Sequence, residues 1–115
     1  MSAVDSILNS IKKLHGIPAE DSSFDPDLTM YINSVFTILT QLGIGPVEGF
    51  YIEDQTTLWS DFVQDRLITE SIRTFMYVKV RLMFDPPASP TMVEALNAVA
   101  KEQEWRILQR AENNI

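Results

Sequence analysis

The stretch FMYVKVRLMFDPPASPTMVEALNAVAKEQEWRIL, residues 75–108, decides the fold of this 115-residue chain. An apolar segment enters it and stops at Phe84-Asp85-Pro86-Pro87, and a second segment starts at Ser89-Pro90. Each proline fixes its φ angle and lacks a backbone N–H, so no helix or strand continues through the pair. We therefore predict a corner at which two long elements either fold back on one another or diverge.

The segment that enters the corner is compatible with two structures. Apolar residues alternate along its second half as they do in a strand, at Met76, Val78, Val80, Leu82 and Phe84. No Gly or Pro interrupts the run from Asp65 to Phe84, and its length of about 20 residues is greater than that of ordinary strands. We favour one buried helix from about residue 65 to residue 84, with the strand as the open alternative.

The segment that leaves the corner is predicted to be a long helix. Ser89 is a suitable N-cap, and Pro90 occupies the first helical position, where no backbone N–H is needed. A stripe with heptad-like spacing follows, at Val93, Leu96, Ala100, Gln103 and Ile107. Three alanines (95, 98 and 100) are interpreted as one thin side that would allow close approach of a neighbour.

Shorter helices are predicted upstream. One covers residues 2–14 with Ser2 as its N-cap, and another begins with Asp25 as cap and Pro26, and stops at Gly43. Thr57 is predicted to cap a short helix over residues 58–63. Turn-forming Gly and Pro residues and a β-prone run, Phe50-Tyr51-Ile52, indicate an extended loop or small hairpin at 44–56. The expected fold is all-α, a small bundle of about four to five helices in a single domain, 1–115.

Composition excludes several functional classes. The chain has no cysteine, so disulfides and thiolate metal sites are excluded. Its net charge of −7 disfavours a basic groove that grips phosphates. No apolar run approaches the roughly 18 residues of a membrane span, and nothing resembles a signal peptide. We expect no membrane association and no strong binding of DNA.

No catalytic pattern is present in the sequence. The single histidine, His15, lies at a predicted helix end and does not make a zinc site alone. Carboxylates at residues 53, 54, 61, 65 and 70 show no setting that would raise the pKa of one of them. No serine stands in a Gly-x-Ser-x-Gly elbow, and no Gly-rich phosphate loop exists. We expect no enzymatic activity and no cofactor.

Aromatic residues are the main candidates for partner contacts. Exposed aromatic loops often bind partners, and tryptophan is enriched at interface hot spots. Phe50 and Ile52 either contact a partner or cover the edge of the core. Trp59 and Trp105 each suit core or interface, and we favour the core for Trp105. The candidate interface residues are Phe50, Tyr51, Ile52, Trp59, Phe84, Asp85, Pro86, Pro87, Trp105 and Arg106.

Two segments carry a resemblance to a known family. They are Tyr77-Val78-Lys79-Val80-Arg81-Leu82-Met83-Phe84-Asp85-Pro86-Pro87 and the downstream Glu102-Gln103-Glu104-Trp105-Arg106. Similarity to the same family also lies in Phe24-Asp25, Asn33-Ser34-Val35, Gln41-Leu42-Gly43-Ile44-Gly45-Pro46 and Trp59-Ser60-Asp61-Phe62. Together these resemble the small head–tail connector (adaptor, head-completion) proteins of long-tailed bacteriophages, from about residue 5 to residue 110. The pieces are structural, and Phe-Asp-Pro-Pro with the later Glu-Trp-Arg is the most specific combination.

The resemblance implies a helical protomer that forms a ring of about a dozen copies beneath the portal vertex of the phage head. Such a ring joins the portal to the tail or to the next connector protein and extends the DNA channel, through which DNA passes without specific binding. It implies a location in the virion, with assembly in the host cytoplasm. The loop 44–56 and the Ala-rich side of the last helix are our candidate ring contacts.

Two other classes remain as alternatives. A small adaptor, such as a regulator or antitoxin, would bind a helix of another protein in a groove. An enzyme or nucleic-acid binder is the weakest class, because no catalytic motif and no basic patch is visible. Rings in micrographs of the purified protein favour the connector, whereas strong DNA binding at physiological salt favours the third class.

Overall fold

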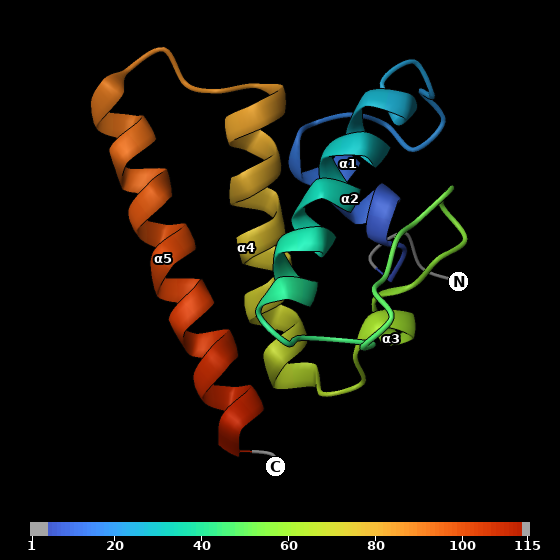
Figure 1. Cartoon of the computed structure of the whole chain (residues 1–115). Coiled ribbons are helices and arrows are strands. Elements are labelled where there is room, and N and C mark those ends of the chain that lie inside the picture. Colours follow the sequence, from blue (N-terminus) through green and yellow to red (C-terminus); the bar gives the residue numbers. More distant parts are fainter. Residues whose placement is uncertain (1–4, 114–115) are drawn as a thin grey trace. The chain divides into compact units, whose positions relative to one another are not determined.

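The structure is a computed structural model that describes residues 5–113, with side chains to residue 112. Within this range the chain forms five helices and no strand, which confirms the predicted all-α class. The helices are α1 (Ile7–Leu14), α2 (Asp25–Gln41), α3 (Trp59–Phe62), α4 (Arg66–Phe84) and α5 (Pro90–Asn113) (Figure 1). They fall into two compact units, Met1–Gln64 and Asp65–Ile115, which are described separately. That the two make up a single domain stays a prediction.

In the first unit, α1 starts later than its apolar pattern predicts. The predicted cap Ser2 lies outside the described residues, while Asp5 and Ser6 are not helical and Ser6 is the N-cap. The reason is pairing with a distant segment. The N–H of Ile7 donates to the carbonyl of Thr57 at 3.1 Å, and the N–H of Trp59 donates to the carbonyl of Asp5 at 3.1 Å. These bonds hold the entry to α1 in an extended conformation.

The second and third helices also begin one residue away from their predicted caps. Phe24, rather than Asp25, is the N-cap of α2. The Asp25 carboxylate instead forms an ion pair at 2.9 Å with Lys12, whose side chain is buried and also donates to the carbonyl of Ala19 at 2.9 Å. Leu58, rather than Thr57, is the N-cap of α3, because the Asp61 carboxylate accepts a bond of 2.8 Å from its N–H.

The C-terminal stop of α2 is confirmed. Gly43 follows the cap residue Leu42 and has a φ of +82°, a left-handed conformation that favours glycine. The chain then runs from residue 44 to residue 57 as turns and extended backbone without a hairpin.

The second unit is an antiparallel hairpin of α4 and α5, so the two elements at the proline corner fold back on one another (Figure 1). Residues 76–84 are helical, so the helix that we favour is confirmed and the strand alternative is wrong. Ser89 caps α5, since its hydroxyl accepts a bond from the N–H of Met92 at 3.4 Å. The predicted stripe of α5 faces inward, with Ala100 and Ile107 buried and the others half-buried.

Candidate interaction surfaces

The loop at 44–56 is fixed to the first unit by an aromatic cluster. The Phe50 ring lies 4.9 Å from that of Phe36 and 5.0 Å from that of Phe62, measured between ring centroids. Gly45 makes this packing possible, because a Cβ at this position would lie 2.3 Å from an atom of the Phe62 ring. The φ of Gly45, +85°, also favours glycine. Phe50 therefore covers the core, as one of its two predicted roles requires.

A second attachment of the loop is made by Asn33 of α2. Its side-chain amide donates to the carbonyl of Ile52 at 3.0 Å, and its side-chain oxygen accepts from the N–H of Ile52 at 2.8 Å. Ile52 itself is buried. The residues on either side of Ile52 are directed to solvent. Tyr51 is 66 % exposed and Glu53 is exposed.

We call residues 51–53 the Tyr51–Glu53 ridge. The adjacent Asp54 accepts bonds from the hydroxyl and the N–H of Thr56. The bond from the Thr56 hydroxyl, followed by that from its N–H, lowers the pKa of Asp54 below the ordinary value. The ridge therefore stands beside a carboxylate that stays ionised at neutral pH, and it is held from behind by α2 and the aromatic cluster.

The two tryptophans occupy opposite environments. Trp59 is 4 % exposed, and its indole N–H donates to the Ser10 hydroxyl at 2.9 Å. Trp105 is 61 % exposed on α5, so our interpretation of it as a core residue is wrong. The reason is that α5 buries only the side that carries Ala100 and Ile107, and Trp105 lies away from that side. Beside it, Arg106 pairs with Glu102 at 3.0 Å, and both side chains are exposed.

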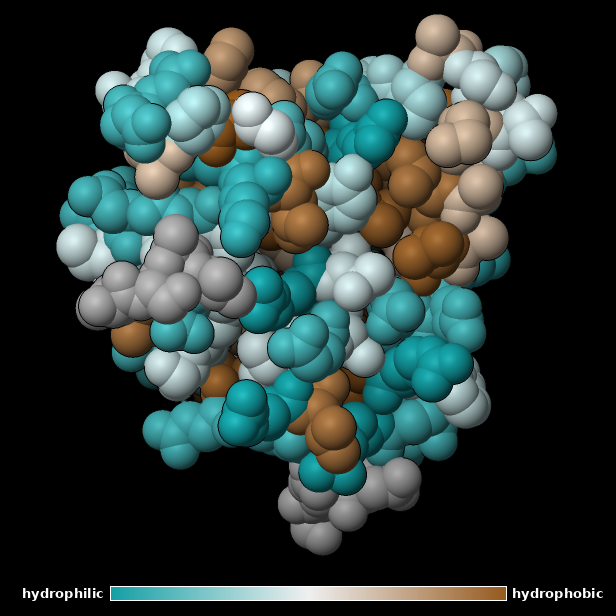
Figure 2. Space-filling view, turned by 180° about the vertical axis from the view of Figure 1, so that it is seen from behind, coloured by the Kyte–Doolittle hydropathy of each residue, from teal (hydrophilic) through white to brown (hydrophobic). Residues whose placement is uncertain are grey.

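The alanines of α5 do not form the single thin side that we predict. Ala100 is buried, whereas Ala95 and Ala98 are exposed, because steps of two and five residues rotate the side chain to another part of the helix. The exposed side of the hairpin also carries Met83, Met92 and Val99, which are 40 %, 49 % and 37 % exposed. In the view from behind, apolar side chains reach the surface among hydrophilic ones (Figure 2).

At the corner, Asp85 and Pro86 are exposed, and Phe84 and Pro87 are half-buried. Asp85 ends α4, where its N–H donates to the carbonyl of Arg81 at 2.9 Å. The partner contacts of the ten candidate interface residues stay predictions. The structure does show that Phe50, Ile52 and Trp59 serve the interior.

The open end of the hairpin is closed by an ion pair that the sequence reading missed. Arg110 near the end of α5 donates to the two carboxylate oxygens of Asp65 at 2.7 and 3.4 Å. The bonds to Asp65 raise the pKa of the Arg110 guanidinium. Asp65 also caps α4, since it accepts from the N–H of Leu67 at 3.1 Å. A separation of 45 residues gives no local signal for this pairing.

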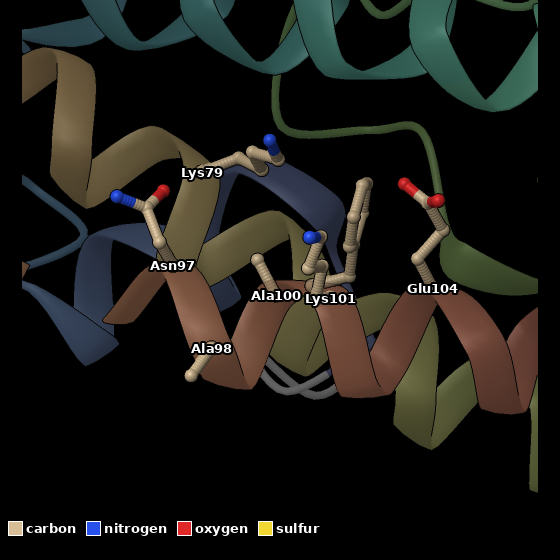
Figure 3. A pocket seen from close by; sticks show the side chains of 7 residues that line it. Lys79, Asn97, Ala98, Ala100, Lys101 and Glu104 are labelled. Atoms are coloured by element: carbon tan, nitrogen blue, oxygen red, sulfur yellow. The ribbon is translucent and has the colours of Figure 1, made fainter. Parts of the chain in front are cut away.

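A cleft of about 420 Å³ lies along the hairpin (Figure 3). Its lining includes the ring of Phe75 and the small Ala100. Figure 3 shows Asn97, Lys101 and Glu104 on α5, and Lys79 on α4 reaching toward the same opening. The Lys79 ammonium lies 5.7 Å from the centroid of the Phe75 ring. The sequence reading also missed this cleft and Lys101.

Charge is distributed very unequally between the two units. Residues 1–64 hold nine of the sixteen Asp and Glu residues but two of the nine Lys and Arg residues, which gives −7. Residues 65–115 hold the remaining seven of each, which gives zero. The first unit therefore accounts for the whole net charge of the protein.

The described residues show neither a metal site nor a membrane-spanning helix. Within residues 5–113, no group of His, Asp and Glu side chains is arranged to hold a metal ion. None of the described helices has the length and apolarity needed to cross a membrane. Three surfaces are considered further: the Tyr51–Glu53 ridge, the cleft, and the exposed side of α5, which carries Met92, Val99 and Trp105.

Comparison with known proteins identifies the family. No curated protein and no solved structure matches the chain. A family model described as phage connector protein matches residues 7–114, which is nearly the whole chain and includes both units. This confirms the resemblance read from the Phe-Asp-Pro-Pro and Glu-Trp-Arg segments. The chain belongs to the phage connector protein family, and its role is that of a structural connector in the phage particle.

Proposed function

We propose that this protein is the subunit of a ring of about a dozen copies that joins the portal of the phage head to the tail and extends the DNA channel. The observation that carries the proposal is the connector-family match over residues 7–114. The ring would bind the portal on one side and the next connector or tail-completion protein on the other. Assembly would take place in the host cytoplasm, and the finished ring would remain at the head–tail junction of the virion.

Ring formation requires two different surfaces on one subunit. In a closed ring each contact is heterologous, so a patch on one copy meets a different patch on the next. The chain offers such distinct surfaces: the acidic Tyr51–Glu53 ridge in the first unit, and both the α4–α5 cleft and the exposed side of α5 with Trp105 in the second. Because exposed tryptophan side chains are enriched at interfaces, the exposure of Trp105 supports a contact that forms only on assembly.

The charge distribution supports a role as a conduit. Non-specific DNA affinity comes mainly from Lys and Arg side chains that replace condensed counterions. The first unit has only Lys12 and Lys13, and Lys12 is already paired with Asp25. A surface of this sign repels the phosphate backbone, which would let DNA move past the ring without adhering to it.

The proposal is tested by adding the purified protein to heads that carry the portal but lack connectors. We expect the protein to sediment with these heads and negative-stain images to show a ring beneath the portal. Heads that lack the portal are the control and should retain none. If the protein fails to join portal-bearing heads at concentrations far above those of the heads, the proposed function is wrong.

A further inference from the structure

We propose that the Tyr51–Glu53 ridge of one copy docks into the α4–α5 cleft of a second copy. The inference rests on the self-assembly in the proposed function and names the contact that would produce it. It assigns a surface to each side of a heterologous interface, which is the kind of interface that closes a ring.

The ridge is prepared for such a contact. Asn33 holds the backbone of Ile52 through two hydrogen bonds, and Phe50 is packed between two other rings. Tyr51 and Glu53 therefore point outward from a fixed backbone, and little conformational freedom is lost when they bind. The ridge presents one aromatic ring and one carboxylate, which line the same small hollow of the surface.

The cleft offers the matching chemistry. The buried side chains of Phe75 and Ala100 form its apolar floor, and the volume above them, about 420 Å³, is large enough to receive an aromatic ring. Lys79 and Lys101 line it, and neither forms an ion pair with a carboxylate of the described residues. Glu104 also lines the cleft, so the carboxylate of the ridge must lie toward the lysines and away from it.

Charge complementarity selects a second copy as the occupant. The ridge belongs to a unit with a net charge of −7, and the cleft belongs to a unit in which every acidic residue is balanced by a basic one. Two acidic units would repel one another, whereas the contact between ridge and cleft pairs Glu53 with Lys79 and Lys101, which form no ion pair among the described residues. The first unit of one copy would therefore contact the second unit of the next copy, which makes the assembly head-to-tail.

Charge reversal tests the pairing. We would measure association of the full chain by native mass spectrometry and light scattering for the wild type, Glu53→Lys, Lys101→Glu and the double variant. Each single reversal replaces attraction by repulsion and should weaken association at least about tenfold, which corresponds to 1.4 kcal/mol. The double variant restores the pair with inverted signs and should regain most of the loss. Circular dichroism should be the same for all four proteins, because both side chains are exposed.

Matched controls separate this contact from a general effect of charge. Glu48→Lys changes the net charge as Glu53→Lys does, in the same loop, and Lys13→Glu matches Lys101→Glu. Both controls should stay within about twofold of the wild type, since distant exposed charges are largely screened at physiological salt.

The outcomes are distinct. Rings that form equally well in every variant, or a double variant that is no better than the singles, would overturn the ridge-to-cleft contact and leave the ring in place. If the double variant regains thermal stability as a monomer but does not regain association, Glu53 and Lys101 pair within one chain. That result would also overturn the ridge-to-cleft contact. A wild type that stays monomeric both free and on portal-bearing heads would overturn the contact and the ring together.

Discussion

Replacing Gly45 by alanine tests whether the loop is packed as the structure shows. The φ of +85° makes any residue with a Cβ cost roughly 1–2 kcal/mol at this position. The new Cβ would also lie 2.3 Å from Phe62 Cε1, in a ring that is buried between Phe36 and Phe50. Overpacking of this kind typically costs 1–3 kcal/mol. The expected loss in the free energy of unfolding is therefore about 2–5 kcal/mol.

Gly43→Ala is the matched control for this prediction. Gly43 has nearly the same φ, +82°, but a Cβ there would meet nothing within 4 Å. Its expected loss is the backbone cost alone, roughly 1–2 kcal/mol. The difference between the two variants isolates the contact with Phe62.

Urea denaturation followed by tryptophan fluorescence measures both losses. With a slope of about 1.5 kcal/mol per molar, Gly45→Ala should lower the midpoint by more than 1 M and Gly43→Ala by about 1 M. Adding Phe62→Leu to Gly45→Ala should cost less than the two single changes combined, because the smaller side chain relieves the clash. Equal losses for the two alanine variants, or strict additivity with Phe62→Leu, would refute the packing of the loop against Phe62.

Three further predictions concern a tryptophan pair, the corner and an ionised carboxylate. Trp59→Ala should lower the free energy of unfolding by about 3–5 kcal/mol, whereas Trp105→Ala should change it by less than about 1 kcal/mol while reducing binding to portal-bearing heads; equal destabilisation in urea would contradict the assigned environments. Replacing both Pro86 and Pro87 by alanine should leave the helix content seen by circular dichroism unchanged but impair assembly, and unimpaired assembly would show that the corner is dispensable. The pKa of Asp54 is lowered in the folded protein, so its stabilisation of the loop is complete above its ordinary value of 3.8 and is lost as the pH falls through the lower folded value; a carboxyl resonance that titrates at or above 3.8 in NMR spectra would contradict the Thr56 bonds.

Local signals in the sequence predicted the helices whose ends are set by neighbouring residues. Ser89 and Pro90 start α5, and Gly43 ends α2, because capping depends on a few adjacent backbone groups. The choice of helix for residues 76–84 was also correct, since the length of the uninterrupted run outweighed its strand-like alternation. These features need no knowledge of the tertiary fold.

Features set by distant residues were not predictable in the same way. The start of α1 moves to Ile7 because the backbone near Asp5 pairs with residues about 50 positions later. Asp25 does not cap α2 as predicted, because its carboxylate forms an ion pair with Lys12. The Asp65–Arg110 pair and the clamp of Asn33 on Ile52 likewise depend on which helices pack together. No period or cap in the sequence encodes these choices.

The exposed side of α5 shows why interaction surfaces are hard to recognise in such a chain. Periodicity identifies a helix, but an apolar residue that will be buried by a partner follows the same periodicity as one buried in the core. Only the packing of α4 shows that Ala100 and Ile107 face inward. Met92 and Val99, seven residues apart, then lie together on another side and remain exposed. Apolar residues at helical spacing therefore remain exposed in this chain. Trp105 differs from Trp59 in lying away from the side of α5 that carries the buried Ala100 and Ile107, and its own sequence context does not show this.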